Sequence, residues 1–500
     1  MDLLRYYHTL KYLKPAQIVG RVLFRVSKPR PDFSPAPPAR PLSGVWMAPA
    51  RRRQSVMAQN RCCFLDEEHD ISTAAAWNEP TLEKLWLYNL HYFDDLNAFG
   101  AAGRTAWQRR LIARWVAENR AGQGTGFEPY PTSLRVVNWI KWALAGNALE
   151  PAWLESLAVQ TRWLAKRLEF HLLGNHLFVN AKALVFAGLF FEGPEAQAWL
   201  ERGLGLLARE LPEQILPDGG QFERSPMYHA LALEDLLDLL NVAAAYPRAI
   251  PAAWEGLVSG WPAILGGMRH WLAALCHPDG EISFFNDAAI GIAPAPAELE
   301  AYALRLGLPA TPELKPGLIH LADSGYVAVR REGMAALLDV APVGPDYLPG
   351  HAHADTLSFE LSLAGQRVLV NSGTSRYGLG EERQWQRGTA AHNTLRIDGQ
   401  DSSEVWGGFR VARRAQPFGL RIEEDEKGLR VACSHDGYRR LRGKPVHRRE
   451  WRFFDGGMEI TDSIEGRFAE AVSRLYFHPG VAVTADGNEG KAGWEGGSLR

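Results

Sequence analysis

Two histidines and an aspartate occupy alternate positions in the segment His351-Ala-His353-Ala-Asp355. The residues that follow, 357–363, alternate apolar and polar side chains, which predicts a β-strand. Because every second side chain of a strand points the same way, we expect His351, His353 and Asp355 to share one face at the strand's start. Such a face can bind a metal ion or form a general base with its orienting partner. A hydrogen-bonded polar cluster is the alternative.

Three further polar clusters stand beside predicted elements. They are Gly174-Asn175-His176 near the start of a helical segment, residues 218–229 with Tyr228 at the opening of another, and His392-Asn393 at a strand start. Each has an ordinary structural explanation, such as a helix cap, a buried hydrogen-bonded pair or a turn. A catalytic or binding role is therefore expected only if the fold brings these clusters together.

The elements that must position these clusters change character along the chain. Between about residues 80 and 310, apolar residues recur at intervals of three and four, which predicts helices at 107–119, 134–146, 151–168, 180–191, 195–210, 228–245 and 252–275. After about residue 318 the apolar segments are short and alternating, as in antiparallel sheets. The pattern predicts an α+β multidomain chain in which a helical domain precedes a sandwich-like β domain.

These changes divide the chain into three parts. We expect an N-terminal amphipathic segment and Pro-rich strap over 1–50, a helical domain over 51–315 and a β domain over 316–500. No closing strand is evident in the last six residues, so the β domain is expected to be incomplete. The first 28 residues are basic and amphipathic; we expect a helix packed on the body of the protein, with a membrane-surface helix as the alternative.

Bulk composition excludes several classes of function. The chain is 46% hydrophobic and 22% charged with a net charge of −2, which gives no support for nucleic-acid binding. No apolar run reaches the length of a transmembrane helix. Charged residues interrupt the N-terminal apolar runs, so no signal peptide is predicted and a cytoplasmic location is expected, with a periplasmic one as the alternative. The four cysteines lack the spacing of a zinc knuckle or a disulfide framework.

Taken in order, the motifs resemble those of the heparinase II/III-like polysaccharide lyases, a group that includes alginate and oligoalginate lyases. The resemblance covers most of the chain and rests on five segments: Gly174-Asn175-His176, Gly219-Gly220-Gln221 with Tyr228, His351–Asp355, Asn371-Ser-Gly373-Thr374 and His392-Asn393. It implies an incomplete (α/α) toroid followed by an antiparallel β-sandwich.

The resemblance also implies β-elimination at a uronic acid, in an acidic polysaccharide or oligosaccharide such as a glycosaminoglycan or alginate. Asn175, helped by His176, is then the group that neutralises the uronate carboxylate. Tyr228 is the catalytic acid and the base for one uronate epimer, and His351 is the base for the other. An amide suits the first role because it donates hydrogen bonds without titrating.

The resemblance also implies a possible zinc site. Metal-containing members of the family hold a zinc ion at positions that correspond in this sequence to His353, Asn371 and His392. Asn371 departs from the family, which has an acidic residue there, and an amide oxygen is a poor zinc ligand. We therefore expect no required cofactor and favour a hydrogen-bonded His353–His392 pair. Zinc binding with Asp355 in place of Asn371 is the alternative.

Several other polar and aromatic residues are candidate substrate contacts, with buried structural polarity as the alternative for each: Arg135, Asn138, Trp139, Tyr88, His91, Glu223 and Asp287. Glu223 and Asp287 are also the carboxylates that a toroid-type glycoside hydrolase would need. The function predicted here is a carbon–oxygen lyase of uronate polymers. A hydrolase, or a non-catalytic glycan-binding or polysaccharide-assembly protein, is the alternative. The sequence does not indicate the oligomeric state.

Overall fold

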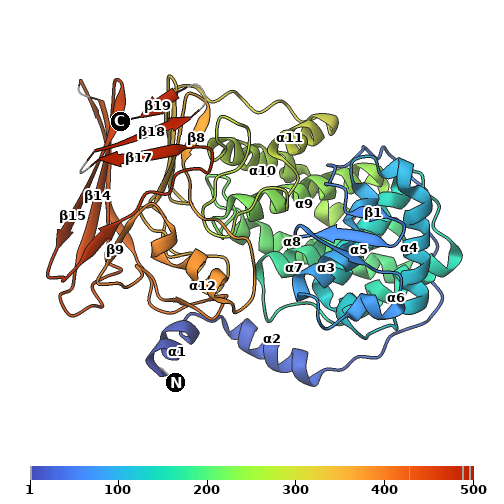
Figure 1. Ribbon diagram of the computed structural model, residues 1–500. Coiled ribbons are helices and arrows are strands. Elements are labelled where there is room, and N and C mark those ends of the chain that lie inside the picture. The colour runs from blue at the N-terminus through green and yellow to red at the C-terminus, as the bar shows by residue number, and fades with distance from the viewer. Residues whose placement is uncertain (1–2, 427, 487–488, 495–496, 500) are drawn as a thin grey trace.

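The computed structural model describes residues 3–426, 428–486, 489–494 and 497–499. Figure 1 shows the helices gathered on one side of the molecule and the sheets on the other, so the predicted order of a helical domain and a β domain is confirmed. The α-helices of the helical domain are α3 (Lys84–Tyr92), α4 (Thr105–Glu118), α5 (Pro129–Leu144), α6 (Pro151–Ala165), α7 (Gly174–Phe190), α8 (Pro194–Gln214), α9 (Pro226–Ala245), α10 (Glu255–Ala274) and α11 (Pro296–Arg305).

Helix α7 forms the centre of the helical domain. Almost all of its residues are buried, and it lies against α5, α6, α8 and α9. A Cβ on Gly188 would lie 2.6 Å from the backbone nitrogen of Leu200, and one on Gly203 would lie 2.8 Å from the carbonyl oxygen of Ala181. These two glycines therefore permit the close approach of α7 and α8.

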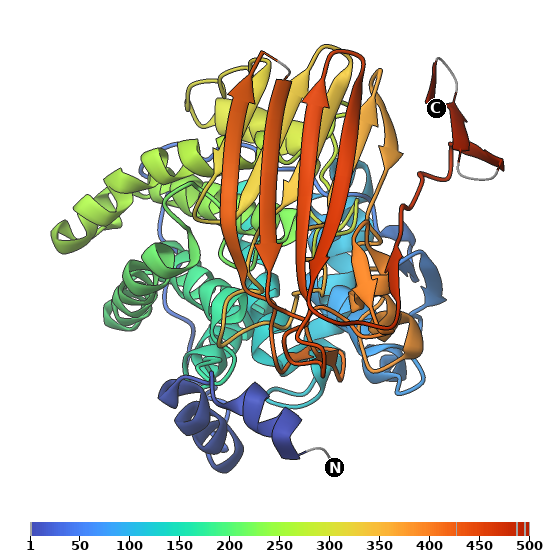
Figure 2. The ribbon, with the colours of Figure 1, turned by 90° about the vertical axis from the view of Figure 1, so that its left-hand side faces the viewer.

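The β domain contains two large antiparallel sheets. One has the order β4-β5-β6-β7-β8 and the other β12-β13-β14-β15, and Figure 2 shows the second sheet covering the first. The strands of the first sheet are β4 (Gly317–Leu321), β5 (Tyr326–Arg331), β6 (Met334–Asp339), β7 (Phe359–Leu363) and β8 (Gln366–Leu369). Those of the second are β12 (Pro417–Asp425), β13 (Gly428–His435), β14 (Val446–Phe454) and β15 (Gly457–Glu465).

Strand β5 shows how the two domains are joined. Val327 and Val329 share a core with Val431 and Trp451 of the second sheet. The alternate residues Tyr326 and Ala328 pack with α10 through a separate apolar cluster. The first sheet is therefore buried on both faces, which fixes the helical domain against the sandwich.

The predicted strand start at His351 is wrong. Residues 351–357 form an irregular loop, and β7 begins only at Phe359. Leu357 has a φ of 65°, and Asn286 Oδ1 accepts a hydrogen bond from the backbone N–H of His353. Because the backbone is not extended, His351, His353 and Asp355 do not share one face: His351 borders the interdomain space, whereas the other two are buried.

Two short helices, α1 (Leu3–Leu10) and α2 (Pro15–Val26), lie outside both domains along one edge of the molecule (Figures 1 and 2). An extended segment then runs over the helical domain, where Arg40 and Gly44 donate backbone hydrogen bonds to Phe190 and Ala245. In the part of the chain that the structure describes, no helix has the length and apolar character needed to cross a membrane.

Short strands complete the architecture: β1 (Val56–Ala58), β2 (Arg61–Phe64), β3 (Glu67–Asp70), β9 (Leu395–Ile397), β10 (Val405–Trp406), β11 (Arg410–Val411), β16 (Ala471–Ser473), β17 (Ala482–Asp486), β18 (Glu489–Trp494) and β19 (Gly497–Leu499). A short helix, α12 (Glu381–Arg387), follows the first sheet. The last six residues, where no strand was predicted, contain β19, while residues 495, 496 and 500 lie outside the described part.

Candidate active site

A cleft of about 900 Å³ opens between the two domains, a size typical of ligand-binding sites. The helical domain contributes residues of α3, α5, α7 and α9, and the β domain contributes loop residues. All four candidate catalytic residues line this cleft, although they come from three separate segments: Asn175, His176, Tyr228 and His351. Residues 374–383, called the cleft loop below, form a continuous part of its wall.

Tyr228 and His351 form a stacked pair across the domain boundary. Their ring centroids are 3.7 Å apart and their planes differ by 12°. Ser225 caps α9 by accepting a hydrogen bond from the Tyr228 backbone N–H, which places Tyr228 in the first turn. The two side chains can therefore act on neighbouring atoms of one ligand.

Glu223 orients His351 from behind. Its carboxylate is buried and bonds Nδ1 of the His351 ring. Glu223 is itself held by Gln221, whose side-chain oxygen accepts from the Glu223 backbone N–H at 2.9 Å. A carboxylate on Nδ1–H leaves Nε2 as the basic nitrogen, which is the arrangement that orients a catalytic histidine.

Asn175 and His176 lie in the first turn of α7. The free N–H groups and the dipole of a helix N-terminus favour negative charge at this end. The His176 ring bonds the Glu169 carboxylate through Nδ1 at 3.1 Å. Burial alone would lower the pKa of His176. The negative charges of Glu169 and Glu223 raise it by more than burial lowers it, so the pKa of His176 lies above its usual value.

Four further tyrosines line the cleft: Tyr88, Tyr92, Tyr130 and Tyr377. The hydroxyl oxygens of Tyr228 and Tyr377 are 2.9 Å apart and share a hydrogen bond. Burial, together with neighbouring Tyr377 and Asp287, raises the pKa of Tyr228 well above its usual value. Its hydroxyl is therefore protonated at neutral pH and able to donate.

Four candidate substrate contacts lie buried away from the cleft. Arg135 is fully buried, with its guanidinium 3.8 Å from the Trp115 ring and donating to the backbone of His91 and Gly126. His91 accepts from Trp115 Nε1, and burial lowers its pKa to about 3. Asn138 and Trp139 are also buried, on the same helix. Among these candidates on α3 and α5, only Tyr88 lines the cleft.

Glu223 and Asp287 do not line the cleft either. Asp287 is buried between two partners: Arg383 binds both of its oxygens, and His353 Nε2 lies 2.8 Å from Oδ1. Although burial favours the neutral acid, Arg383 and His353 hold the pKa of Asp287 well below its usual value. Asp287 thus ties the cleft loop, through Arg383, to the segment that carries His353.

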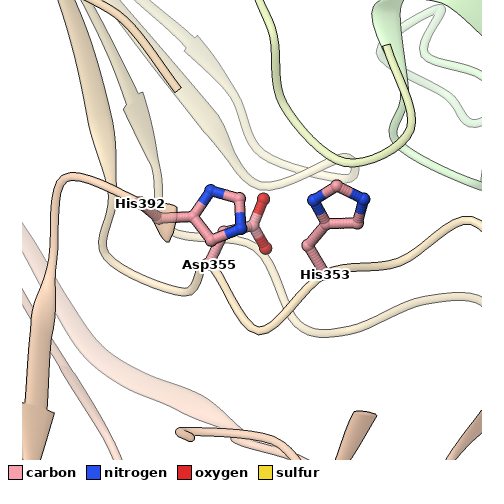
Figure 3. Close-up of side chains that lie close together, drawn as sticks. All are labelled: His353, Asp355 and His392. Carbon is pink, nitrogen blue, oxygen red and sulfur yellow. The ribbon is translucent and has the colours of Figure 1, made fainter. Parts of the chain in front are cut away.

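His353, Asp355 and His392 gather next to this pair (Figure 3), with one candidate ligand atom from each lying within 4.8 Å of the others. All three are buried. Neither nitrogen of His392, nor Nδ1 of His353, makes a hydrogen bond of normal geometry, so the expected hydrogen-bonded histidine pair is not formed. Burial lowers the pKa of His353 to about 4. Burial and the neighbouring His353 lower the pKa of His392 well below its usual value.

The side chain of Asn371, which the family resemblance placed among the metal ligands, makes long polar contacts within the β domain. Its side-chain nitrogen lies 3.4 Å from Ser358 Oγ, and its side-chain oxygen accepts from the Asn393 backbone N–H at 3.4 Å. The structure therefore pairs the two histidines with Asp355. Imidazole nitrogens that lack a hydrogen-bond partner, Nδ1 of His353 and either nitrogen of His392, form with the Asp355 carboxylate a donor set that suits zinc.

Two family descriptions match the chain. Residues 137–295 match the heparinase II/III N-terminus, and residues 313–498 match the heparinase II/III-like C-terminal domain. The chain belongs to the heparinase II/III-like family. The matches fall in both domains and include every residue of the candidate catalytic set.

Curated heparinase II/III-like relatives include two heparin-sulfate lyases. That of Bacteroides stercoris is 30% identical over 329 residues, which is 61% of this chain and 46% of the relative. That of Pedobacter heparinus is 25% identical over 286 residues, 51% of this chain and 41% of the relative. The matched part of the chain thus spans about half the length of these relatives.

Solved heparinase structures share the fold. A heparinase III crystal structure has a TM-score of 0.61 at 18% identity and covers 86% of this chain and 69% of that one. The structure of the heparan sulfate lyase of Pedobacter heparinus has a TM-score of 0.55 at 18% identity, and the match covers 95% of this chain and 77% of that one. The toroid followed by a sandwich, expected from the motifs, is confirmed as the fold.

The sequence did not single out Tyr377 or Arg383 of this heparinase II/III-like chain. Both lie on the cleft loop, and Arg383 is within 5.0 Å of the Tyr377 ring centroid. Tyr377 lies in the segment Ser375-Arg-Tyr-Gly-Leu-Gly380, where two glycines flank an exposed leucine after a strand, and Arg383 follows three residues later. Such a glycine-containing loop at a strand end is a common position for binding residues.

Proposed function

We propose that the chain is a lyase that cleaves a uronate-containing polysaccharide or oligosaccharide by β-elimination. The observation that carries the proposal is the meeting of Asn175, His176, Tyr228 and His351 on one cleft, with Tyr228 stacked on a His351 that Glu223 orients. The similarity to proteins named heparin-sulfate lyases supports the same class of reaction.

The reaction begins at the C5 proton, next to the uronate carboxylate. When a base removes this proton, the electron pair forms the C4–C5 double bond, and the C4–O bond breaks as the leaving oxygen takes a proton. Negative charge accumulates on the carboxylate before that bond breaks. The Asn175 amide, the N-terminus of α7 and His176, whose raised pKa favours its cationic form, lie at one wall of the cleft to stabilise this charge.

His351 is the proposed base and Tyr228 the proposed acid. Glu223 on Nδ1 leaves Nε2 to accept the C5 proton. The raised pKa of Tyr228 keeps its hydroxyl protonated, so that this group has a proton to donate to the leaving oxygen. The same raised pKa disfavours Tyr228 as a base, so we assign it the acid role alone.

The charges of the cleft favour a sparsely charged substrate. Four basic residues line it (Arg52, Lys84, Arg376 and Arg383), together with four acidic residues (Glu83, Asp94, Glu381 and Glu382). A densely sulfated chain would meet as much repulsion as attraction here. We propose a polymer whose repeating unit carries a carboxylate and little or no sulfate.

The two carboxylates named for the hydrolase alternative do not line the cleft. A glycoside hydrolase needs two that face the scissile bond, whereas Glu223 and Asp287 are buried and engaged by His351 and Arg383. A glycan-binding protein without activity would need no acid–base pair, and the assay below separates it from a lyase.

The test is a panel of uronate polymers with and without sulfate, followed by the ultraviolet absorbance of the unsaturated product. We expect absorbance to grow fastest with unsulfated polymers and to be lost with Tyr228→Phe. Tyr246→Phe is the matched control, because Tyr246 is a buried tyrosine of the helical domain that does not line the cleft. New reducing ends without absorbance, or binding without either, would contradict the proposal.

We also propose that His353, Asp355 and His392 hold a zinc ion, which would brace the loop that carries His351. The purified protein, dialysed after exposure to zinc, is expected to retain about one zinc ion per chain by mass spectrometry of the metal. Asp355→Ala should abolish retention, and Asn371→Ala should preserve it. Loss of zinc with Asn371→Ala but not with Asp355→Ala would contradict this ligand set.

A further inference from the structure

Helix α2 turns its apolar face away from the protein. Ile18, Val19, Val22, Leu23 and Val26 are each 55–69% exposed. Their spacing places them on one stripe of the helix. A helix on a globular protein normally directs such a stripe toward the core, and contiguous exposed apolar surface marks an interaction site.

Specific contacts hold α2 in this orientation. Gln17 is buried, and its side-chain nitrogen donates to the carbonyl oxygen of Tyr347 at 3.1 Å. A Cβ on Gly20 would meet the backbone of Phe170 at 2.9 Å, so only glycine allows this approach. The Phe24 ring packs under the Arg167 guanidinium at 3.5 Å. Residues 17, 20 and 24 share one face, which is the face opposite the apolar stripe.

Helix α1 extends the exposed apolar surface. Leu3, Leu4, Tyr7 and Leu10 are all more than half exposed, while Tyr6 packs edge-on against Trp406 at 4.9 Å between ring centroids. Both views of the molecule show α1 and α2 along the same edge (Figures 1 and 2). The exposed apolar side chains of these two helices are together called the N-terminal apolar face below.

The charge of this region is opposite to that of the rest. Residues 1–30 contain seven Lys or Arg and one Asp, a net charge of +6. Because the whole chain carries −2, the remainder carries −8. Arg21 and Arg25 lie one turn apart on a flank of α2, beside the apolar stripe, and both are exposed.

We propose that the N-terminal apolar face docks on an anionic lipid bilayer, with α1 and α2 lying in the headgroup region. Apolar side chains enter the boundary of the acyl chains, and the flanking cations contact anionic headgroups, as in interfacial amphipathic helices. At 12 residues, α2 is far too short to span a bilayer and is suited to lying along it. In a symmetric contact, a second copy of this chain would offer the same positive charge to this face, which disfavours that dimer.

The test is co-sedimentation of the full chain with vesicles of phosphatidylcholine alone or mixed with phosphatidylglycerol. We expect binding to the anionic vesicles that weakens with salt, and little binding to neutral ones. Ile18→Ser/Val22→Ser/Leu23→Ser should lower the bound fraction at least tenfold, and Arg21→Gln/Arg25→Gln should lower it severalfold. Val45→Ser is the matched control, because Val45 is 65% exposed on another segment. This variant should bind vesicles as the unaltered protein does.

Three outcomes would overturn the proposal. They are absence of binding to anionic vesicles, equal binding to neutral and anionic vesicles, and equal binding by the triple variant. Analytical ultracentrifugation of the same samples identifies a dimer: concentration-dependent association that the triple variant abolishes, without vesicle binding, would assign the face to a second copy. Because the cleft is not altered, lyase activity on a soluble polymer is expected to be unchanged in every variant.

Discussion

At the scale of single residues, a buried carboxylate orients the proposed base, His351, which faces the cleft. Glu223 fixes the tautomer of His351, so Glu223→Gln should reduce kcat by roughly 10²-fold or more with a smaller effect on KM. Initial rates on the best polymer measure this. Glu210→Gln is the control, since Glu210 is a buried carboxylate of the same domain that does not line the cleft. Equal kcat in both variants would contradict the positioning role.

His176 gives a pH dependence whose sign follows from its raised pKa. The Glu169–His176 pair stabilises the folded state fully below the unfolded pKa of about 6.5, and this contribution is lost as pH rises through the higher folded pKa. The difference in Tm between the unaltered protein and His176→Gln should therefore be largest in mildly acidic buffer and shrink in alkaline buffer. A difference that grows with pH would contradict this sign.

At the scale of elements, the cleft loop is held by one buried ion pair. Arg383→Leu leaves the Asp287 carboxylate buried without its main partner, which should cost about 3–5 kcal/mol of unfolding free energy. Arg376→Leu, on the same loop, loses only exposed pairs with Glu83 and Glu382 and should cost less than about 1 kcal/mol. Urea unfolding measures both. Similar costs for the two variants would contradict the pinning role of Arg383.

The elements also show what the sequence could and could not predict. Periodicity predicted the long helices to within a few residues at most ends, because apolar spacing reports directly on the buried face. It failed for residues 351–357, where alternation resembles a strand but side-chain bonds from Asn286 and a left-handed Leu357 impose a loop. The pairing of Arg383 with Asp287 joins positions 96 residues apart, and no local pattern reports on such a contact.

Among the candidate site residues, some positions could likewise be predicted from the sequence and others could not. The position of four residues on the cleft could be predicted, because each belongs to a short motif of a known family: Asn175, His176, Tyr228 and His351. Arg135, Asn138 and His91 carry equally polar side chains, yet their bonds are internal to the helical domain. Only burial distinguishes a polar group that binds a ligand from one that binds its own backbone, and burial depends on the packing of whole helices.

At the scale of the whole molecule, the proposed reaction requires both domains. The helical domain supplies Asn175, His176 and Tyr228, and the β domain supplies His351 and the cleft loop. Their relative position depends on the apolar cluster between α10 and β5 and on the buried ion pair of Asp287. The cleft is therefore expected to form only when the two domains are docked.

The measurement that tests the central claim most directly is cleavage of an unsulfated uronate polymer in ¹⁸O-labelled water, with the products weighed by mass spectrometry. Elimination breaks the C4–O bond without water, so the account predicts products with an unsaturated end, lighter than hydrolysis products by one water and free of label from the cleavage step. Tyr228→Phe should yield none of them. Incorporation of ¹⁸O at the new end during cleavage, or unsaturated product at an undiminished rate from Tyr228→Phe, would contradict the account.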